Sequence, residues 1–247
     1  VVKDKFEVSD YTDPIKSGII GLANSLITSK QGVLTAKKTS INPNWAAVFI
    51  GYFQSLHLKA GDEIAVSATG SFPALNIAMI VAAETYGLKP LVITSVGASS
   101  YGANRENLSS IDIETLLRKS KIIRTKSIAL SRGGKEDLGL NLAGKAVLDE
   151  IASRNGYEYI DGVSGRDMTD KRIKVYRGFS KDIKLYVNIG GSISSVGSIK
   201  AKSTLLPGIN YPGSKRTLNH HERGVVGYYL DHGVPVINLN QIVQLAS

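Results

Sequence analysis

Residues 62–104 read DEIAVSATGSFPALNIAMIVAAETYGLKPLVITSVGASSYGAN, and this stretch decides the fold. The apolar runs at 63–68 and 91–96 are typical of buried strands. The apolar segment between them starts at Pro73 and ends at Gly87, residues that favour the first turn and the end of a helix. Strand, helix and strand together form one β-α-β unit. Each strand ends in a turn of Gly and Ser, at the sheet edge where open α/β proteins bind ligands.

The same order of apolar strand, glycine-rich turn and helix recurs along the chain. A helix is expected to begin at Asn42-Pro43, where an amide cap precedes a proline of preset φ. This alternation predicts an α/β fold with a mainly parallel, Rossmann-like three-layer sheet and helices on both faces. Further strands are expected over residues 126–131, 157–160, 183–189 and 234–239, and further helices over 141–155, 168–176 and 223–231.

The chain divides by its pattern into a lead-in and one domain. Residues 1–40 show short apolar clusters broken by glycines and no clear period, so we expect an irregular lead-in. Residues 41–247 are expected to form a single α/β domain. Within it, residues 200–221 are rich in Pro, Gly and basic side chains, which predicts a long loop that closes over the site.

The composition excludes several classes of protein. With 247 residues and 43% hydrophobic content the chain can fill a large core, and its longest apolar stretch is too short to span a membrane, so a soluble domain is expected. The absence of cysteine excludes disulfides, a thiol nucleophile and a thiolate metal site. The net charge of +9 favours a polyanionic partner. No nucleic-acid-binding motif accompanies that charge, so nucleic acid is not an expected partner.

The Gly/Ser turns at the strand ends are the predicted ligand site. Backbone N–H groups in such turns form concave nests for phosphate or carboxylate, and lysines and an arginine lie nearby in the sequence. Neither a Walker A motif nor G-x-G-x-x-G is present, so no cofactor is predicted. The predicted ligand-binding residues are Lys38, Thr69, Gly70, Ser71, Ser99, Asn104, Arg132, Gly133, Gly134, Asn188, Gly190, Gly191 and Ser192.

Catalytic roles are a second hypothesis for the same turns. Ser71 occupies a strand-to-helix turn, as serine nucleophiles do, but the G-x-S-x-G motif is absent and an N-cap role is the better explanation of its hydroxyl. Asp112 and Glu114 follow the second Gly/Ser turn and are candidates for acid/base work, although carboxylates in a first helical turn also compensate the helix dipole. His220-His221 lies in the expected loop, without the spacing of a metal site, and no metal is predicted.

Several segments in order resemble the poly-γ-glutamate system protein family of bacteria. The segments are SGIIGLANSLITSKQGVLTAKKTSINPNWAA, GDEIAVSATGSFPALNIA, SVGASSYGAN followed by Asp112 and Glu114, SRGGKEDLG and YVNIGGS, with a weaker match in RGVVGYYLDHGVPVINL. They cover most of residues 18–195. The chain departs from the family pattern at Lys38, where an arginine is expected, and over residues 200–221.

The resemblance implies a place in making or exporting an anionic, capsule-type polymer. It implies a membrane-associated protein, on the extracytoplasmic face, with an N-terminal anchor outside this chain and with other components of the polymer machinery as partners. The first hypothesis is therefore an accessory protein that binds poly-γ-glutamate or a glutamyl precursor at the strand-end turns. The alternative is a hydrolase or transferase that acts on γ-glutamyl amide bonds through Ser71, Asp112 or Glu114.

Overall fold

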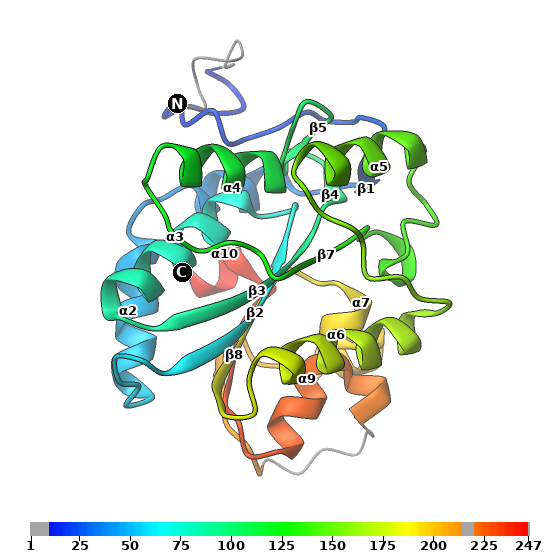
Figure 1. The fold of residues 1–247 in the computed structure, drawn as a ribbon. Helices are drawn as coiled ribbons and strands as arrows, with labels where there is room; N and C mark the ends of the chain where they lie inside the picture. The colour runs from blue at the N-terminus through cyan, green and yellow to red at the C-terminus, as the bar shows by residue number, and fades with distance from the viewer. Residues whose placement is uncertain (1–9, 214–219, 247) are drawn as a thin grey trace.

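A six-stranded sheet organises the structure, a computed structural model that describes residues 10–213 and 220–246 (Figure 1). Its strand order is β7-β3-β2-β8-β10-β9, and every neighbouring pair is parallel except β10 with β9. Helices cover both faces, which confirms the predicted Rossmann-like three-layer α/β fold. The strands are β2 (Glu63–Thr69), β3 (Lys89–Ser95), β7 (Ala129–Ser131), β8 (Ile183–Ile189), β9 (Gly208–Asn210) and β10 (Val236–Leu239).

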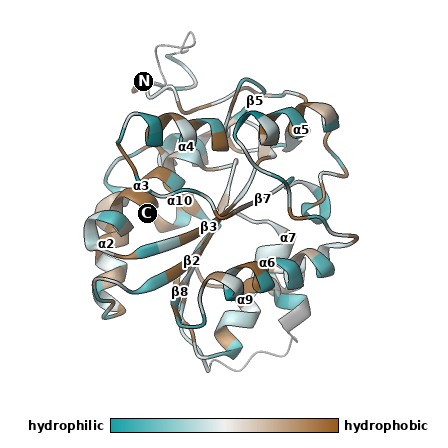
Figure 2. Cartoon of the chain, viewed as in Figure 1, coloured by the Kyte–Doolittle hydropathy of each residue, from teal (hydrophilic) through white to brown (hydrophobic). Residues whose placement is uncertain are grey.

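Two hydrophobic layers hold the helices against the sheet. Side chains alternate across each strand, so Ile64 and Val66 of β2 pack toward one face while Ala65 packs toward the other. The first face carries α2 (Trp45–Ser55), α3 (Pro73–Tyr86), α4 (Ser110–Lys119) and α10 (Ile242–Leu245). The second face carries α6 (Gly165–Phe179) and α9 (His220–Asp231). Figure 2 shows the hydrophobic residues concentrated along the middle of the strands, between these layers.

The strand order places a topological switch point between β2 and β8. From β2 the chain proceeds outward through β3 to β7, and it then returns to the other side of β2 as β8 and continues to β10. Helices leave the two central strands in opposite directions at such a point, so a crevice opens at the carboxyl ends of the strands. Thr69 ends β2 and Gly190 follows β8, so both lie at this crevice.

The segment expected to be an irregular lead-in contains regular structure in its second half. Strand β1 (Thr28–Lys30) pairs in parallel with β4 (Ala98–Ser99), and helix α1 (Leu34–Ser40) follows. The pairing joins residues about seventy positions apart, so no local period in the sequence announces it. As a result, residues 28–40 lie beside the crevice.

Other expected elements differ in length or position. The expected strand over 157–160 is reduced to one bridge between Leu130 and Tyr159. The expected loop over 200–221 holds the end of α8 (Ile199–Ser203) and the edge strand β9; its stretch 214–219 lies outside the described residues, as do the side chains of His220 and His221. Helix α5 (Lys145–Arg154) is shorter than expected and packs beside β7.

The start of α3 also differs from expectation. Phe72, and not Ser71, is the N-cap residue, and Pro73 is the first helical residue as predicted. The Ser71 hydroxyl accepts a hydrogen bond from the Ser99 backbone N–H at 3.0 Å. Ser71 therefore joins two strand-end turns instead of capping its own helix.

None of the helices in the described part of the chain combines the length and the apolar character that a membrane crossing needs.

Candidate functional site

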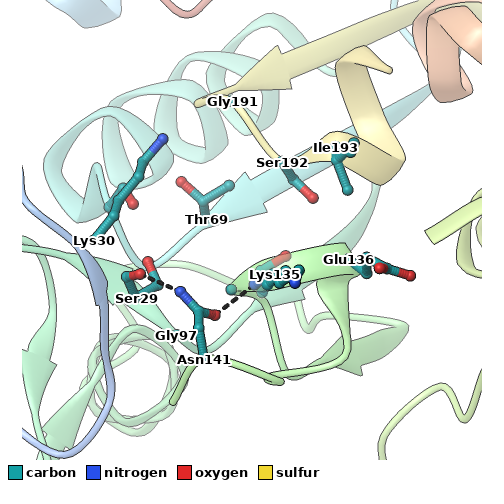
Figure 3. Close-up of a pocket in the computed structure, with 13 residues that line it drawn as sticks. Ser29, Lys30, Thr69, Gly97, Lys135, Glu136, Asn141, Gly191, Ser192 and Ile193 are labelled. Atoms are coloured by element: carbon teal, nitrogen blue, oxygen red, sulfur yellow. Dashed lines mark hydrogen bonds between the residues drawn. The ribbon is translucent and has the colours of Figure 1, made fainter. Parts of the chain in front are cut away.

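A pocket of about 360 Å³ opens at the carboxyl ends of the central strands (Figure 3). Its walls come from β1, from the turns after β2, β3 and β7, and from the Gly-Gly-Ser turn after β8. Strand ends, which the sequence marks by small residues, thus meet at the switch point of the sheet. The lining residues are Ser29, Lys30, Thr69, Ser71, Ser95, Gly97, Gly134, Lys135, Glu136, Asn141, Gly191, Ser192 and Ile193.

Thr69 lies at the centre of this pocket, between Lys30 on one side and Ser192 on the other (Figure 3). The residue is only 6% exposed, and its hydroxyl finds no hydrogen-bond partner within the described chain. A buried hydroxyl without a partner loses its hydration and gains nothing in return, at a cost of about 1–3 kcal/mol. Such an orphaned group, in a residue that lines a pocket, is suited to bind a polar ligand atom.

Gly190 makes room for the Thr69 side chain. A Cβ at position 190 would lie 2.6 Å from the Thr69 hydroxyl oxygen, and the φ of +96° is one that residues with a side chain rarely adopt. The next residue, Gly191, is less restricted, because a Cβ there would meet only the flexible side-chain ends of Asn240, at 2.9 Å from Oδ1, and Lys202, at 3.1 Å from Nζ. Glycine is therefore required at position 190, where the turn after β8 passes the Thr69 side chain.

Three lysines gather at the pocket. Lys30 lines it, Lys202 borders the turn after β8, and Lys37 lies buried behind Ser71. Lys30 acts on both of the others, since its charge adds to burial in lowering the pKa of Lys37 and of Lys202. Within residues 10–213 and 220–246, no carboxylate forms an ion pair with any of the three. The site therefore has positive charge that no carboxylate of the described residues compensates.

Of these lysines, Lys37 has the pKa that is lowered furthest from its ordinary value. It is 2% exposed, and its ammonium donates to the backbone carbonyl of Ser71 and, at 2.9 Å, to the hydroxyl of Ser99. The Nζ atom also lies 3.9 Å from the centre of the Phe72 ring. Burial first, and then the charge of Lys30, lowers the Lys37 pKa to about 7. Near neutral pH this side chain is therefore divided between the ammonium and the free amine.

The one carboxylate among the lining residues is engaged elsewhere. Glu136 Oε2 accepts a hydrogen bond of 3.0 Å from the backbone N–H of Gly165, the first residue of α6. Figure 3 shows its side chain directed away from Thr69 and Lys30. The carboxylate thus compensates the positive end of a helix instead of neutralising the lysines.

A buried ion pair supports the wall of the pocket. Arg172 of α6 is fully buried and bonds Asp137 Oδ2 at 2.7 Å. Burial alone would lower the Arg172 pKa, but the charges of Asp137, Tyr176 and Tyr186 and the hydrogen bond to Asp137 together prevail and raise it, so Arg172 keeps its charge at neutral pH. The Nη2 atom of Arg172 donates to Ser95 and Ser131, at 2.7 and 2.6 Å, and Asp137 accepts from Ser131 at 2.7 Å.

The same pair fixes the turn after β7. Asp137 and its neighbour Glu136 have φ values of 64° and 57°, a conformation that costs about 1 kcal/mol or more per residue with a side chain. The hydrogen bonds from Arg172 and Ser131, and a further one of 2.7 Å from Ser194, hold Asp137 in that conformation. Residues 133–139 therefore form a rigid wall for Lys135 and Gly134, which line the pocket.

Five of the sequence-predicted site residues line the pocket together. Four of the remaining predicted glycines and amides lie just behind the lining and shape it: Gly70 packs against the Val96 carbonyl, and the Asn188 amide bonds the Gly190 carbonyl at 2.8 Å. Gly133 packs against Gly97. The five lining residues are Thr69, Ser71, Gly134, Gly191 and Ser192.

The other predicted ligand residues have different contacts. Asn104 is buried and holds residue 22 through both its amide atoms, at 2.8 Å each. The Arg132 guanidinium stacks over the Tyr159 ring, and Lys38 lies over the ring of Tyr11. Ser99 does not line the pocket, but its hydroxyl accepts from Lys37.

Asp112 and Glu114 lie outside the pocket and have structural partners. Asp112 caps α4 through the N–H and hydroxyl of Ser109 and forms an ion pair of 2.6 Å with Arg154. Burial raises its pKa, but the hydrogen bonds from Arg154, Asn155 and Ser109 prevail and lower it. Glu114 is buried and accepts from the N–H and hydroxyl of Ser127; burial raises its pKa.

Sequence reasoning missed the lining residues that come from β1 and, apart from Gly134, those that follow β7. Ser29 and Lys30 stand in a segment without a period, and only the pairing of β1 with β4 brings them to the crevice. Asn141 joins these two walls, since its amide donates to the Ser29 carbonyl (Figure 3). The available signal was Lys30 in the segment SLITSKQG, where it stands among small polar residues.

The comparisons with known proteins give only distant structural likeness. No family model matches the chain, and no curated protein matches it. Among solved structures the chain is similar to O-ureido-L-serine synthase, with 14% identity over 91% of this chain and 72% of the other, and a TM-score of 0.25. At that TM-score the likeness supports no statement about function.

Proposed function

We propose that this protein binds an anionic glutamyl ligand, poly-γ-glutamate or a precursor of it, in the pocket at the carboxyl ends of β2, β3 and β8. The observation that carries the proposal is the set of uncompensated lysines around the orphaned hydroxyl of Thr69. Hydroxyls of Ser71 and Ser192 line the same space. Carboxylate oxygens are acceptors only, so a site composed of cations and hydroxyl donors suits them.

The resemblance to the poly-γ-glutamate system family supports the choice of ligand. Three of its segments, GDEIAVSATGSFPALNIA, SVGASSYGAN and YVNIGGS, contain Thr69, Gly97 and Gly191, which line the pocket from three different turns. A role as an accessory protein of polymer synthesis or export follows from this resemblance, together with membrane association through an anchor outside the chain.

Titration calorimetry with a short oligo-γ-glutamate tests the proposal. We expect binding at low salt that weakens several-fold at moderate salt, because exposed lysines are screened. Lys30→Gln should weaken binding by about threefold to tenfold, since it removes one charge-assisted contact. Lys89→Gln is the matched control, because it removes the same charge from the exposed first residue of β3, at the end of the strands opposite the pocket. Absence of heat at both salt concentrations, or equal loss with both variants, would refute the proposal.

The enzymatic alternative stays a prediction with its own test. Ser71 lines the pocket, but the hydrogen bond to its hydroxyl comes from a backbone N–H, and Asp112 and Glu114 lie outside the pocket. An enzyme acting on γ-glutamyl amide bonds through Ser71 would lose release of glutamate from the polymer in Ser71→Ala. Unchanged release would remove this alternative.

A further inference from the structure

Anion binding does not require a lysine as deeply buried as Lys37. A surface ammonium such as that of Lys30 attracts a carboxylate without the cost of desolvation. Lys37 instead has a hydroxyl, a carbonyl and an aromatic ring around its Nζ atom, and among the described residues it has no carboxylate partner. These contacts favour the ammonium, but burial and the charge of Lys30 outweigh them and lower the Lys37 pKa, which favours the free amine.

A free amine at neutral pH is chemically different from an ammonium. Its lone pair is available for bonding, and lysines desolvated beside a second cation are the ones that react with carbonyl compounds to form imines. At Lys37 both conditions are met, since burial is the larger and Lys30 the smaller cause of the lowered pKa. An ordinary lysine is almost entirely protonated at the same pH.

The amine lies directly behind the pocket wall. Ser71 separates the two, because its side chain lines the pocket while its backbone carbonyl accepts from Lys37. Lys30, which acts on the Lys37 charge, is itself a lining residue. A ligand whose anionic end binds at Thr69 and Lys30 would therefore have its other atoms close to this amine.

Helix α1 offers a route to the amine. The helix has seven residues and no side-chain cap, and of its residues only Lys37 and Ser40 are buried. Short, lightly packed elements open locally at a low cost in free energy. Exchange of the two hydrogen bonds of Lys37 for contacts with a ligand thus requires no disruption of the main sheet.

We propose that Lys37 is a nucleophilic amine that condenses with the carbonyl group of an anionic ligand held in the pocket. The Nζ lone pair bonds the carbonyl carbon, two protons pass from nitrogen to the former carbonyl oxygen, and water leaves as the C=N bond forms. No electron is gained or lost, and hydrolysis returns the free amine. The inference rests on the proposed function, because the anion site holds the ligand.

Reductive trapping tests this inference directly. The full chain at pH 7.5 is incubated with cyanoborohydride and one of three probes: 2-oxoglutarate, pyridoxal 5′-phosphate or uncharged butanal. Peptide mass spectrometry then measures labelling of each lysine. We expect Lys37 to be labelled roughly tenfold faster than Lys89, since a larger neutral fraction outweighs its weaker nucleophilicity. Labelling of Lys37 at the rate of Lys89 or slower with both anionic probes would overturn the inference.

The probes and one variant separate this inference from the proposed function. Thr69→Val should slow labelling of Lys37 by an anionic probe several-fold and leave butanal labelling unchanged. If the ratio of Lys37 to Lys89 labelling is as high with butanal as with both anionic probes, the inference is overturned, since the pocket then holds no anion for Lys37. Heat with oligo-γ-glutamate but no label on Lys37 would overturn the inference and leave the proposed function intact. Label without such heat would support the inference and refute the glutamyl ligand. The two anionic probes differ in their anion, which is a carboxylate in 2-oxoglutarate and a phosphate in pyridoxal 5′-phosphate. The probe that labels Lys37 more selectively shows which of these anions the pocket binds.

Discussion

Replacing Lys37 with methionine should make the chain less sensitive to pH. In the folded chain the Lys37 pKa is lowered from 10.5 to about 7, so the unfolded chain binds more protons between these values. Stability of the wild type therefore rises with pH through this window and is lowest below pH 7. A shift of this size corresponds to about 5 kcal/mol below pH 7, of which about 2.5 kcal/mol is regained between pH 6 and pH 9.

Urea denaturation at pH 6 and pH 9 measures this effect. The methionine variant also loses the hydrogen bonds to Ser71 and Ser99, but that loss is the same at both pH values. The free energy of unfolding of the variant relative to the wild type should fall by about 2.5 kcal/mol from pH 6 to pH 9. Lys89→Met, at an exposed position, should show no such change. Parallel pH profiles for wild type and Lys37→Met would refute the assignment of a lowered pKa.

Three further predictions concern the supports of the site. Asp137→Ala leaves the fully buried Arg172 without its partner and should lower the free energy of unfolding by about 3–5 kcal/mol in urea denaturation, whereas the exposed Asp149→Ala should change it by less than about 0.5 kcal/mol. Gly190→Ala brings a methyl group against Thr69 and should abolish ligand binding in calorimetry while Gly178→Ala, with open space around it, does not. Asp112→Asn should destabilise α4 by about 1–2 kcal/mol at pH 7, and because the Asp112 pKa is lowered the difference should disappear as the pH falls below its folded pKa; an unchanged difference at pH 2 would contradict this reasoning.

The sequence predicts the sheet and one side of the pocket because both follow local rules. Buried strands and the small residues after them are visible as apolar runs and Gly/Ser turns, so Thr69, Ser71 and Gly191 could be placed at strand ends. That these ends converge depends on strand order, and a β-α-β pattern alone does not say that β8 returns beside β2. Figure 1 shows β8 lying beside β2.

The other side of the pocket depends on contacts distant in sequence. Lys30 and Lys37 belong to a segment without a period, and the pairing of β1 with β4 places them. The basic run of Lys37 and Lys38 predicts cations beside the anion site, but the sequence does not reveal that the ammonium of Lys37 is buried against Ser71 and Phe72. In contrast, the position of Asp112 in the sequence suggested a role in acid/base chemistry. In the structure its carboxylate is paired with Arg154 and accepts a hydrogen bond from the Ser109 N–H at the start of α4.

The most direct test of the central claim, that the pocket is an anion site, is the affinity of Thr69→Val for oligo-γ-glutamate by calorimetry. The Thr69 hydroxyl has no partner in the described chain, so its removal should leave the free energy of unfolding equal or higher while affinity falls about tenfold. Thr94→Val is the matched control: its hydroxyl bonds Ser127 at 2.8 Å, so it should lose stability and keep affinity. If Thr69→Val binds as tightly as the wild type, or if both variants lose affinity equally, the pocket is not the anion site.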